Sequence, residues 1–201
     1  MKSNIKLVAI SGKLGTGKDF IASTHFYPLG FKQISLAWHF KNFLVGQHRL
    51  TWEEAFETKP PHVRHMLQQE GTEFGRNKYH DRIWIDTMQA WMETLNYYWG
   101  ISTFICPDVR FKNELEGLQS LGASIIRIQA TKRNLQATEH NPEARLHQSE
   151  IDLDDVPLHK FDFVINNDIG NEHNVESQIN TFLQDYYPLL LDAKLGVKHF
   201  D

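Results

Sequence analysis

The sequence has a single cysteine, Cys106, among 201 residues, so no intrachain disulfide can form. One cysteine is typical of a protein from a reducing compartment. The chain also lacks an apolar run of about 18 residues, the length that a membrane-spanning helix needs. Residues 1–11 contain too short an apolar run for a signal peptide. We therefore expect a cytoplasmic protein that is not bound to a membrane.

A basic surplus is missing as well, because the formal net charge is −4. A general nucleic-acid binder usually carries excess positive charge, so a nucleic-acid polymer is not the expected partner. A local group of arginines would still bind a small phosphorylated molecule. The eleven histidines have no cysteine partners and no H-E-x-x-H pattern, so we interpret them as surface or hydrogen-bonding residues and not as metal ligands.

Composition and pattern predict one α/β domain over residues 1–201. Hydrophobic residues are 41% of the chain and charged residues 23%, which is ordinary for a globular protein. There are no repeats, low-complexity segments or interdomain linkers. Short apolar runs alternate with helical patterns, which predicts a five-stranded parallel sheet flanked by helices. The expected strands are residues 5–10, 33–36, 102–107 (stopped by Pro107), 123–130 and 161–167.

The expected helices follow the strands and are marked by helical spacing and capping residues. In the helix that Gly100 ends, we expect one buried face formed by Trp84, Met88, Trp91, Met92 and Leu95. Thr51 and Glu54 have the spacing of a capping box. Residues 131–149 are polar and of mixed charge, and they predict a mobile insert. The expected helices are residues 18–26, a helix through 41 and 44, 51–58, 62–76, 81–99, 112–121 and 175–187.

The segment "AISGKLGTGKDF", residues 9–20, nearly fits the phosphate-binding pattern G-x-x-x-x-G-K-[ST]. It lies between a predicted strand and a predicted helix, which is the context that such a loop requires. Its backbone N–H groups and the helix N-terminus would bind phosphate oxygens, with the lysine at the last two phosphates. The candidate ATP-phosphate residues are Gly12, Lys13, Gly15, Thr16, Gly17, Lys18 and Asp19.

Asp19 departs from the pattern, because a serine or threonine hydroxyl usually follows the lysine and meets Mg²⁺. A carboxylate is also a hard oxygen ligand for this ion. Asp19 therefore still allows metal-dependent chemistry, by contact with Mg²⁺ either directly or through water.

The segment "PDVRFKNE", residues 107–114, follows the third strand and is expected at the carboxyl edge of the sheet, where ligands bind. Asp108 would hold the metal's water shell or take a proton from the acceptor. Arg110 would pair with a phosphate, and Glu114, one turn further on, would orient that arginine. The alternative is a capped strand-to-helix turn with a surface ion pair.

Two further groups of polar residues fit an acceptor site and a closing segment. In "VRHMLQQEGTEFGR", Arg64, Gln68 and Arg76 would receive a monophosphate and a base; the alternative is a solvated helix face. In the polar insert, arginines would neutralise charge on a transferring phosphoryl group and closure would exclude water. The candidates there are Lys132, Arg133 and Arg145.

These motifs, with "DRIW", "HQSE" and "FDFVINND", occur in one order from Ile5 to about Phe182. The set resembles the phage-type deoxynucleoside monophosphate kinases of the P-loop kinase superfamily. In that family, and in animal-type phosphomevalonate kinases, aspartate also follows the loop lysine. The resemblance implies an acceptor-binding region (about 37–100), a lid (about 131–149) and often a homodimer. It also implies the cytoplasm of an infected cell, if the chain is of phage origin.

The main hypothesis is therefore transfer of the γ-phosphoryl group of ATP to a deoxynucleoside 5′-monophosphate, with Mg²⁺. Lys18, Arg133 and Asp108 are the expected catalytic residues, and Asn166 is expected near the adenine or as a turn residue. Alternatives are a kinase for a modified nucleotide or for phosphomevalonate, and an ATP-binding regulatory module without transfer. A P-loop motor or helicase is disfavoured, because no apolar strand ends in an Asp-Glu pair.

Overall fold

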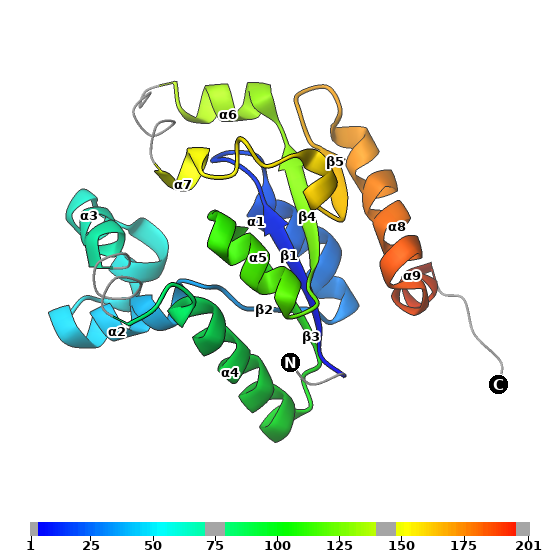
Figure 1. The fold of residues 1–201 in the computed structure, drawn as a ribbon. Helices are drawn as coiled ribbons and strands as arrows, with labels where there is room; N and C mark the ends of the chain where they lie inside the picture. Colours follow the sequence, from blue (N-terminus) through cyan, green and yellow to red (C-terminus); the bar gives the residue numbers. More distant parts are fainter. Residues whose placement is uncertain (1–3, 71–78, 140–147, 196–201) are drawn as a thin grey trace. The chain divides into compact units, whose positions relative to one another are not determined.

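A computed structural model describes residues 4–70, 79–139 and 148–195 (Figure 1). Contacts between residues divide the chain into two compact units. The first, here the helical unit, comprises residues 1–5 and 34–102. The second, here the sheet unit, comprises residues 6–33 and 103–201.

The sheet unit contains five parallel strands in the order β2-β3-β1-β4-β5. The central strand β1 is buried along five of its six residues, as expected for a parallel strand that is covered on both faces. The predicted α/β fold with a five-stranded parallel sheet is confirmed. The strands are β1 (Lys6–Ser11), β2 (Lys32–Gln33), β3 (Thr103–Val109), β4 (Ser124–Gln129) and β5 (Phe163–Asn166).

Strand β3 does not stop at Pro107, as the sequence had suggested, but continues to Val109. The β1–β3 register shifts at this point, since Ala9 pairs with Cys106 and Ser11 pairs with Val109. Proline has no N–H to donate and is accommodated in a sheet where the ladder is irregular. Asp108 therefore lies within the strand, and Arg110 is the first residue after it.

Strand β2 is shorter than predicted and ends before Ile34. Only Lys32 and Gln33 pair with β3. Ile34 and Leu36 are buried all the same. The hydroxyl oxygen of Ser35 accepts a hydrogen bond from the N–H of Ala37, and such a local bond turns the chain away from the ladder.

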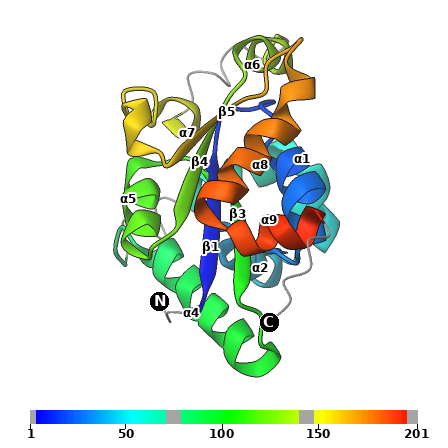
Figure 2. The ribbon, with the colours of Figure 1, turned by 90° about the vertical axis from the view of Figure 1, so that its right-hand side faces the viewer.

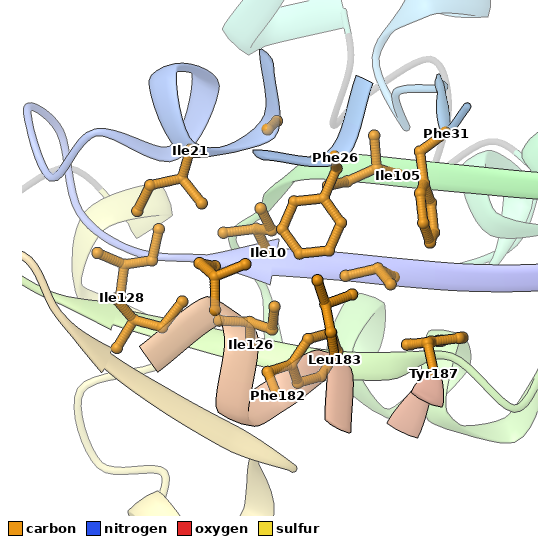
Figure 3. Packing of buried hydrophobic residues seen from close by; sticks show 14 of the residues in the cluster. Ile10, Ile21, Phe26, Phe31, Ile105, Ile126, Ile128, Phe182, Leu183 and Tyr187 are labelled. Atoms are coloured by element: carbon orange, nitrogen blue, oxygen red, sulfur yellow. The ribbon is translucent and has the colours of Figure 1, made fainter. Parts of the chain in front are cut away.

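The two faces of the sheet are covered by different helices (Figure 2). One face packs against α1 (Lys18–Ile21) and α8 (Val175–Tyr186) through a cluster of apolar side chains (Figure 3). The other face, on which Ser11 and Arg127 pair in register, is covered by α5 (Lys112–Ser120). Labelled members of the apolar cluster include Ile10, Ile21, Phe26, Phe31, Ile126, Phe182 and Leu183.

The remaining helices of the sheet unit include one that the sequence missed. The first part of the polar segment 131–149 is not irregular but forms helix α6. The carboxylate of Asp168 accepts hydrogen bonds from the N–H groups of Lys132 and Arg133 and so stabilises the first turn. The other helical segments are Ala22–Phe26, Tyr27–Leu29, α6 (Thr131–Ala137), α7 (Gln148–Ile151), Leu158–Lys160, Glu172–Asn174 and α9 (Pro188–Leu195).

The helical unit contains α2 (Trp38–His48), α3 (Pro61–Glu70), α4 (Ile83–Trp99) and a π-helical turn at Glu54–Thr58. The predicted capping box is confirmed, because Thr51 Oγ1 accepts from the N–H of Glu54 and Glu54 accepts from the N–H of Thr51. Gly100, with φ of 68°, ends α4 as predicted.

The buried face of α4 differs in part from the predicted one. Ile85, Met88 and Met92 are buried, at spacings of three and four residues. Trp91 is 45% exposed and stacks on His39 with ring centroids 5.3 Å apart. The indole therefore lies at the margin of the buried stripe, where one ring face is covered and the other is not.

Candidate active site

The glycine-rich loop connects β1 to α1 and has the backbone that its sequence predicts. Gly15 and Gly17 have backbone φ angles of 77° and 88°, which residues other than glycine rarely adopt. Thr16 is buried, and its hydroxyl donates to the carbonyl of Lys13 over 2.8 Å. This hydrogen bond closes a turn within the loop, and the N–H groups of such a turn can bind an anion.

Two asparagine side chains hold the loop from outside. Asn134 on α6 donates from Nδ2 to the carbonyl of Leu14 over 2.8 Å, and Asn167 donates from Nδ2 to the carbonyl of Thr16 over 2.9 Å. Asn166, which the sequence placed near the adenine or in a turn, accepts from the N–H of Asp168 with its side chain and so forms a turn. The amide that meets the loop is therefore one residue further along the chain.

Lys18 is 7% exposed, and its Nζ donates to the carbonyl of Lys13 over 2.8 Å. Burial lowers its pKa from 10.5 to about 8, with Arg110 adding to the effect and Glu150 and Asp19 opposing it. An ammonium group with a lowered pKa is held in unfavourable surroundings. Such a group gains strongly from a phosphate beside it.

Arg110 lies beside the loop, but the residue that holds its guanidinium is not the predicted one. Glu114 was expected to orient the guanidinium; instead its carboxylate accepts from the N–H groups of Arg110 and Phe111 and caps α5. Because Glu114 is the third residue of that helix, its side chain reaches back to the N-terminus. The guanidinium pairs with Glu150 on α7.

Glu150 joins this arginine to the loop. One oxygen of its carboxylate accepts from Arg110, and the other accepts from the N–H of Leu14 over 2.7 Å. The residue is 8% exposed. Both carboxylate oxygens are thus used, and a buried carboxylate with two donors is well compensated.

A hollow opens next to the loop, on the α5 face of the sheet. The hollow is shallow, and its empty space of about 180 Å³ includes open solvent. Arg127 on β4 donates from Nη1 to the hydroxyl of Ser11 over 2.8 Å, and burial lowers the pKa of its guanidinium, against the opposing effect of Asp154 and Glu150. The lining residues are Gly12, Lys13, Val109, Arg110, Arg127, Ser149, Glu150 and Leu153.

Asp108 is half-buried and lies near Cys106, whose Sγ is 3.1 Å from Asp108 Oδ1. Burial, together with the charge of Asp108, raises the pKa of the Cys106 thiol well above its ordinary value. The thiol therefore stays protonated and donates to the carboxylate. Asp19, the other proposed metal ligand, is exposed on α1.

No group of three or more His, Cys, Asp or Glu side chains within residues 4–70, 79–139 and 148–195 could bind a metal ion on its own. Mg²⁺ commonly takes only one or two carboxylates, together with substrate phosphates and water. The carboxylates of Asp19 and Asp108 are the right chemical type for such a shared site.

Arg133 and Lys132, expected in the lid, lie on α6. The Nε of Arg133 donates to the carbonyl of Asn167 over 2.7 Å, so this side chain bridges α6 and the turn after β5. Lys132 is exposed. Arg145 lies outside the described residues.

The acceptor candidates belong to the helical unit. Arg64 and Gln68 lie on α3, but the structure describes the backbone there and not these side chains. Arg76 lies outside the described residues. Their role as acceptor ligands therefore stays a prediction.

Sequence reasoning missed Arg127, Glu150, Asn134, Asn167 and Asp154. A usable signal existed for Arg127, because it is the one charged residue in the apolar strand segment "ASIIRIQA" and lies opposite the residue before the loop. Glu150 was part of "HQSE", but no charge partner could be named for it without the fold.

A comparison with protein families assigns the chain to one of them. Residues 47–171, more than half of the chain, match the family described as "Deoxynucleotide monophosphate kinase". The chain belongs to the deoxynucleotide monophosphate kinase family. It is thus a P-loop kinase, and the predicted resemblance is confirmed. The matched range does not include the glycine-rich loop, whose geometry supports the broader assignment to the P-loop proteins.

Among solved structures, a dephospho-CoA kinase from Campylobacter jejuni is similar, with 20% identity, a TM-score of 0.49 and coverage of 90% of this chain and 96% of its own. A shikimate kinase from Bacteroides thetaiotaomicron has 11% identity, a TM-score of 0.48 and coverage of 89% and 97%. No curated protein sequence matches this kinase. In the part of the kinase that the structure describes, no helix is both long and apolar enough to cross a membrane.

Gly15 offers a test of how tightly α6 holds the loop of this kinase. A Cβ at Gly15 would lie 2.4 Å from the Cβ of Ala137 and 3.2 Å from the carbonyl oxygen of Arg133. Gly15→Ala is therefore expected to push α6 away, lowering the free energy of unfolding by roughly 1 to 3 kcal/mol beyond the backbone strain alone. Urea unfolding measures this loss of stability, and ATP titration measures the effect on ATP affinity.

Gly122→Ala is the matched control, because Gly122 has φ of 81° but a Cβ there meets nothing within 4 Å. It should show the strain of a left-handed alanine, about 1 kcal/mol, and unchanged ATP affinity. Equal losses of stability in the two variants, with ATP affinity intact in both, would mean that α6 does not restrain the loop.

Proposed function

We propose that this kinase transfers the γ-phosphoryl group of ATP to a deoxynucleoside 5′-monophosphate and releases ADP and the diphosphate. The observation that carries the proposal is the buried Lys18 in a glycine-rich loop, next to the Arg110–Glu150 pair, in a chain of this family. Phosphoryl transfer asks for positioning and charge neutralisation more than for covalent chemistry.

On the donor side, the loop N–H groups and Lys18 would bind the β- and γ-phosphates of ATP. An oxygen of the acceptor phosphate forms a bond to the γ-phosphorus, and the bond from that phosphorus to the β–γ bridging oxygen breaks. The leaving group is ADP, and the charge that develops on the bridging oxygen lies beside the ammonium of Lys18. A buried environment strengthens this interaction.

On the acceptor side, Arg110 is the candidate ligand for the phosphate that attacks. Its pairing with Glu150 fixes the direction of the guanidinium and leaves further N–H donors of the group for a phosphate. Arg64, Gln68 and Arg76 are proposed to bind the rest of the monophosphate. Lys132, Arg133 and Arg145 are proposed as the cations that approach from the lid.

Asp19 and Asp108 are the residues that would hold Mg²⁺. The ion, when bound, neutralises charge on the phosphate oxygens. Asp108 Oδ1 accepts a hydrogen bond from the Cys106 thiol, and the Asp108 carboxylate would hold the metal's water shell or take a proton from the acceptor.

A substrate panel tests the proposal. Purified protein with ATP and Mg²⁺ is offered dTMP, dGMP, the other deoxynucleotides, the ribonucleotides and phosphomevalonate, and ADP release is measured. We expect the highest kcat/KM with a deoxynucleoside monophosphate, because the family is described by that acceptor and a planar base suits Phe74, Tyr79 and Trp84 of the acceptor segment. The Lys18→Ala protein, purified in parallel, controls for contaminating kinases.

Two results would contradict the proposal in different ways. Turnover of phosphomevalonate alone would replace the nucleotide acceptor with an aliphatic one. ATP binding without phosphoryl transfer to any compound in the panel would identify a regulatory module.

A further inference from the structure

Arg127 occupies an unusual position for a charged residue. It lies in the middle of β4, between strands β1 and β5 of the sheet, and its side chain is 12% exposed. It pairs in register with Ser11, the last residue before the loop begins at Gly12. Placing a guanidinium here is costly in free energy unless its charge and its N–H donors are used.

Contacts with the described residues occupy only some of the N–H donors of the Arg127 guanidinium. Nη1 donates to Ser11 Oγ, and the guanidinium lies over the ring of Phe161 at 5.5 Å. The nearest carboxylate oxygen, Asp154 Oδ1, is 3.9 Å from Nη2, which is too long for a hydrogen bond. A guanidinium has five N–H donors, so most of those of Arg127 have no acceptor among the described residues.

The surroundings of Arg127 favour an anion. Arg127 shares the hollow with Lys13 and Arg110, and Glu150 is the acidic residue among those that line it. The positive charge of Arg127 also contributes to the lowered pKa of Lys18. The guanidinium therefore lies close to the loop lysine, within the field of several cations.

Asp154 contacts Lys13 and lies near Arg127, on the solvent side of both. Its Oδ2 accepts from Lys13 Nζ over 2.6 Å, and its side chain is 42% exposed. It follows α7 in a turn, so a rotation of its side chain moves the carboxylate away from both Lys13 and Arg127. A phosphate that reaches these cations has to compete with this carboxylate.

We propose that Arg127 and Lys13 form a phosphoryl-binding subsite beside the glycine-rich loop, and that Asp154 competes with the phosphate for it. A guanidinium with unused donors binds two oxygens of a phosphate at once. The assignment of this subsite to a nucleotide's phosphoryl group rests on the proposed function, whereas its affinity for phosphate does not.

Inorganic phosphate is the probe, titrated at constant ionic strength against the midpoint of thermal unfolding, with chloride as the reference anion. Arg127→Gln should weaken the apparent phosphate affinity roughly tenfold or more, as for the loss of hydrogen bonds to a charged group. Asp154→Asn should strengthen it roughly two- to fivefold, since an exposed ion pair is weak. Opposite changes in phosphate affinity in these two variants would show that Asp154 competes with phosphate for Arg127.

Lys112→Ala is the matched control. Lys112 pairs with Asp155, the neighbour of Asp154, over 2.7 Å, but it does not line the hollow. This variant should leave phosphate affinity unchanged. If Asp154 merely anchors its segment, Asp154→Asn will weaken phosphate binding or leave it as it is, and either result overturns the proposal, as does wild-type affinity in Arg127→Gln.

Arg127→Lys and kinetics complete the design. Arg127→Lys keeps the charge but loses the planar donor group, so its phosphate affinity should lie between wild type and Arg127→Gln. If Arg127→Gln does not fold, Asp154→Asn and Arg127→Lys still decide. In turnover assays, a raised KM for ATP assigns the subsite to the donor, and a raised KM for the monophosphate assigns it to the acceptor. A failed substrate panel would leave the phosphate titration valid.

Discussion

Replacing Lys18 with alanine is expected to lower kcat by about 10³-fold while the protein stays folded. The ammonium of Lys18 is buried and fixed at the loop by its bond to the carbonyl of Lys13. In the proposed reaction the ammonium would stabilise the charge that develops when the β–γ bond breaks, and alanine has no group that could do so. Initial rates with ATP and the best acceptor measure the loss, and circular dichroism checks the fold.

Lys112→Ala again serves as the control, because it removes a lysine from a surface ion pair with Asp155 in the same unit. It should retain wild-type turnover. Near-wild-type turnover in Lys18→Ala would remove the loop from the catalytic assignment, whatever the substrate panel shows.

The second large effect is on stability: Lys18→Met is expected to raise the free energy of unfolding by roughly 3 kcal/mol at pH 7. In the folded protein the pKa of Lys18 is lowered from 10.5 to about 8, chiefly by burial. Holding the charged form there therefore opposes folding. Methionine fills the volume of the lysine stem without the charge, and the carbonyl of Lys13 keeps the Thr16 hydroxyl as a donor.

The pH dependence gives this prediction its sign. Below about pH 8 Lys18 is protonated in both states, so the full cost of burying the charge is present. As the pH rises towards 10.5, the folded protein has already lost the proton while the unfolded chain still binds it. The free energy of unfolding of the wild type therefore rises with pH, and its difference from that of Lys18→Met becomes smaller. Urea unfolding of both proteins from pH 6 to 10.5 follows the difference; a difference that is constant with pH would contradict the lowered pKa.

The sequence predicted the sheet well because its strands are short apolar runs, which need no partner to be recognised. It failed at Pro107, since proline usually ends a strand and only the neighbouring register shows that the ladder is irregular there. It failed at β2 for a related reason. Ile34 and Leu36 are buried without being paired, and hydrophobicity alone does not distinguish the two situations.

Local sequence patterns could propose site residues that follow one another in the chain, but they could not give contacts between distant segments. The loop and Arg110 came from local patterns. The partner of Arg110 could not, because Glu150 is 40 residues away in sequence and Glu114 offered a nearer carboxylate at helical spacing. Helix α6 was missed because it has no apolar stripe; it meets the loop through the hydrogen bond from Asn134 and through the small side chain of Ala137.

The two asparagines that hold the loop have a consequence for the entropy of nucleotide binding. Asn134 and Asn167 bind the carbonyls of Leu14 and Thr16 from outside, so these two peptide groups are fixed with their oxygens away from the ligand side. Fixing a carbonyl in this way also fixes the N–H of the following residue, here Gly15 and Gly17. The loop is therefore preorganised for anion binding, and little conformational entropy is left to lose when phosphate arrives.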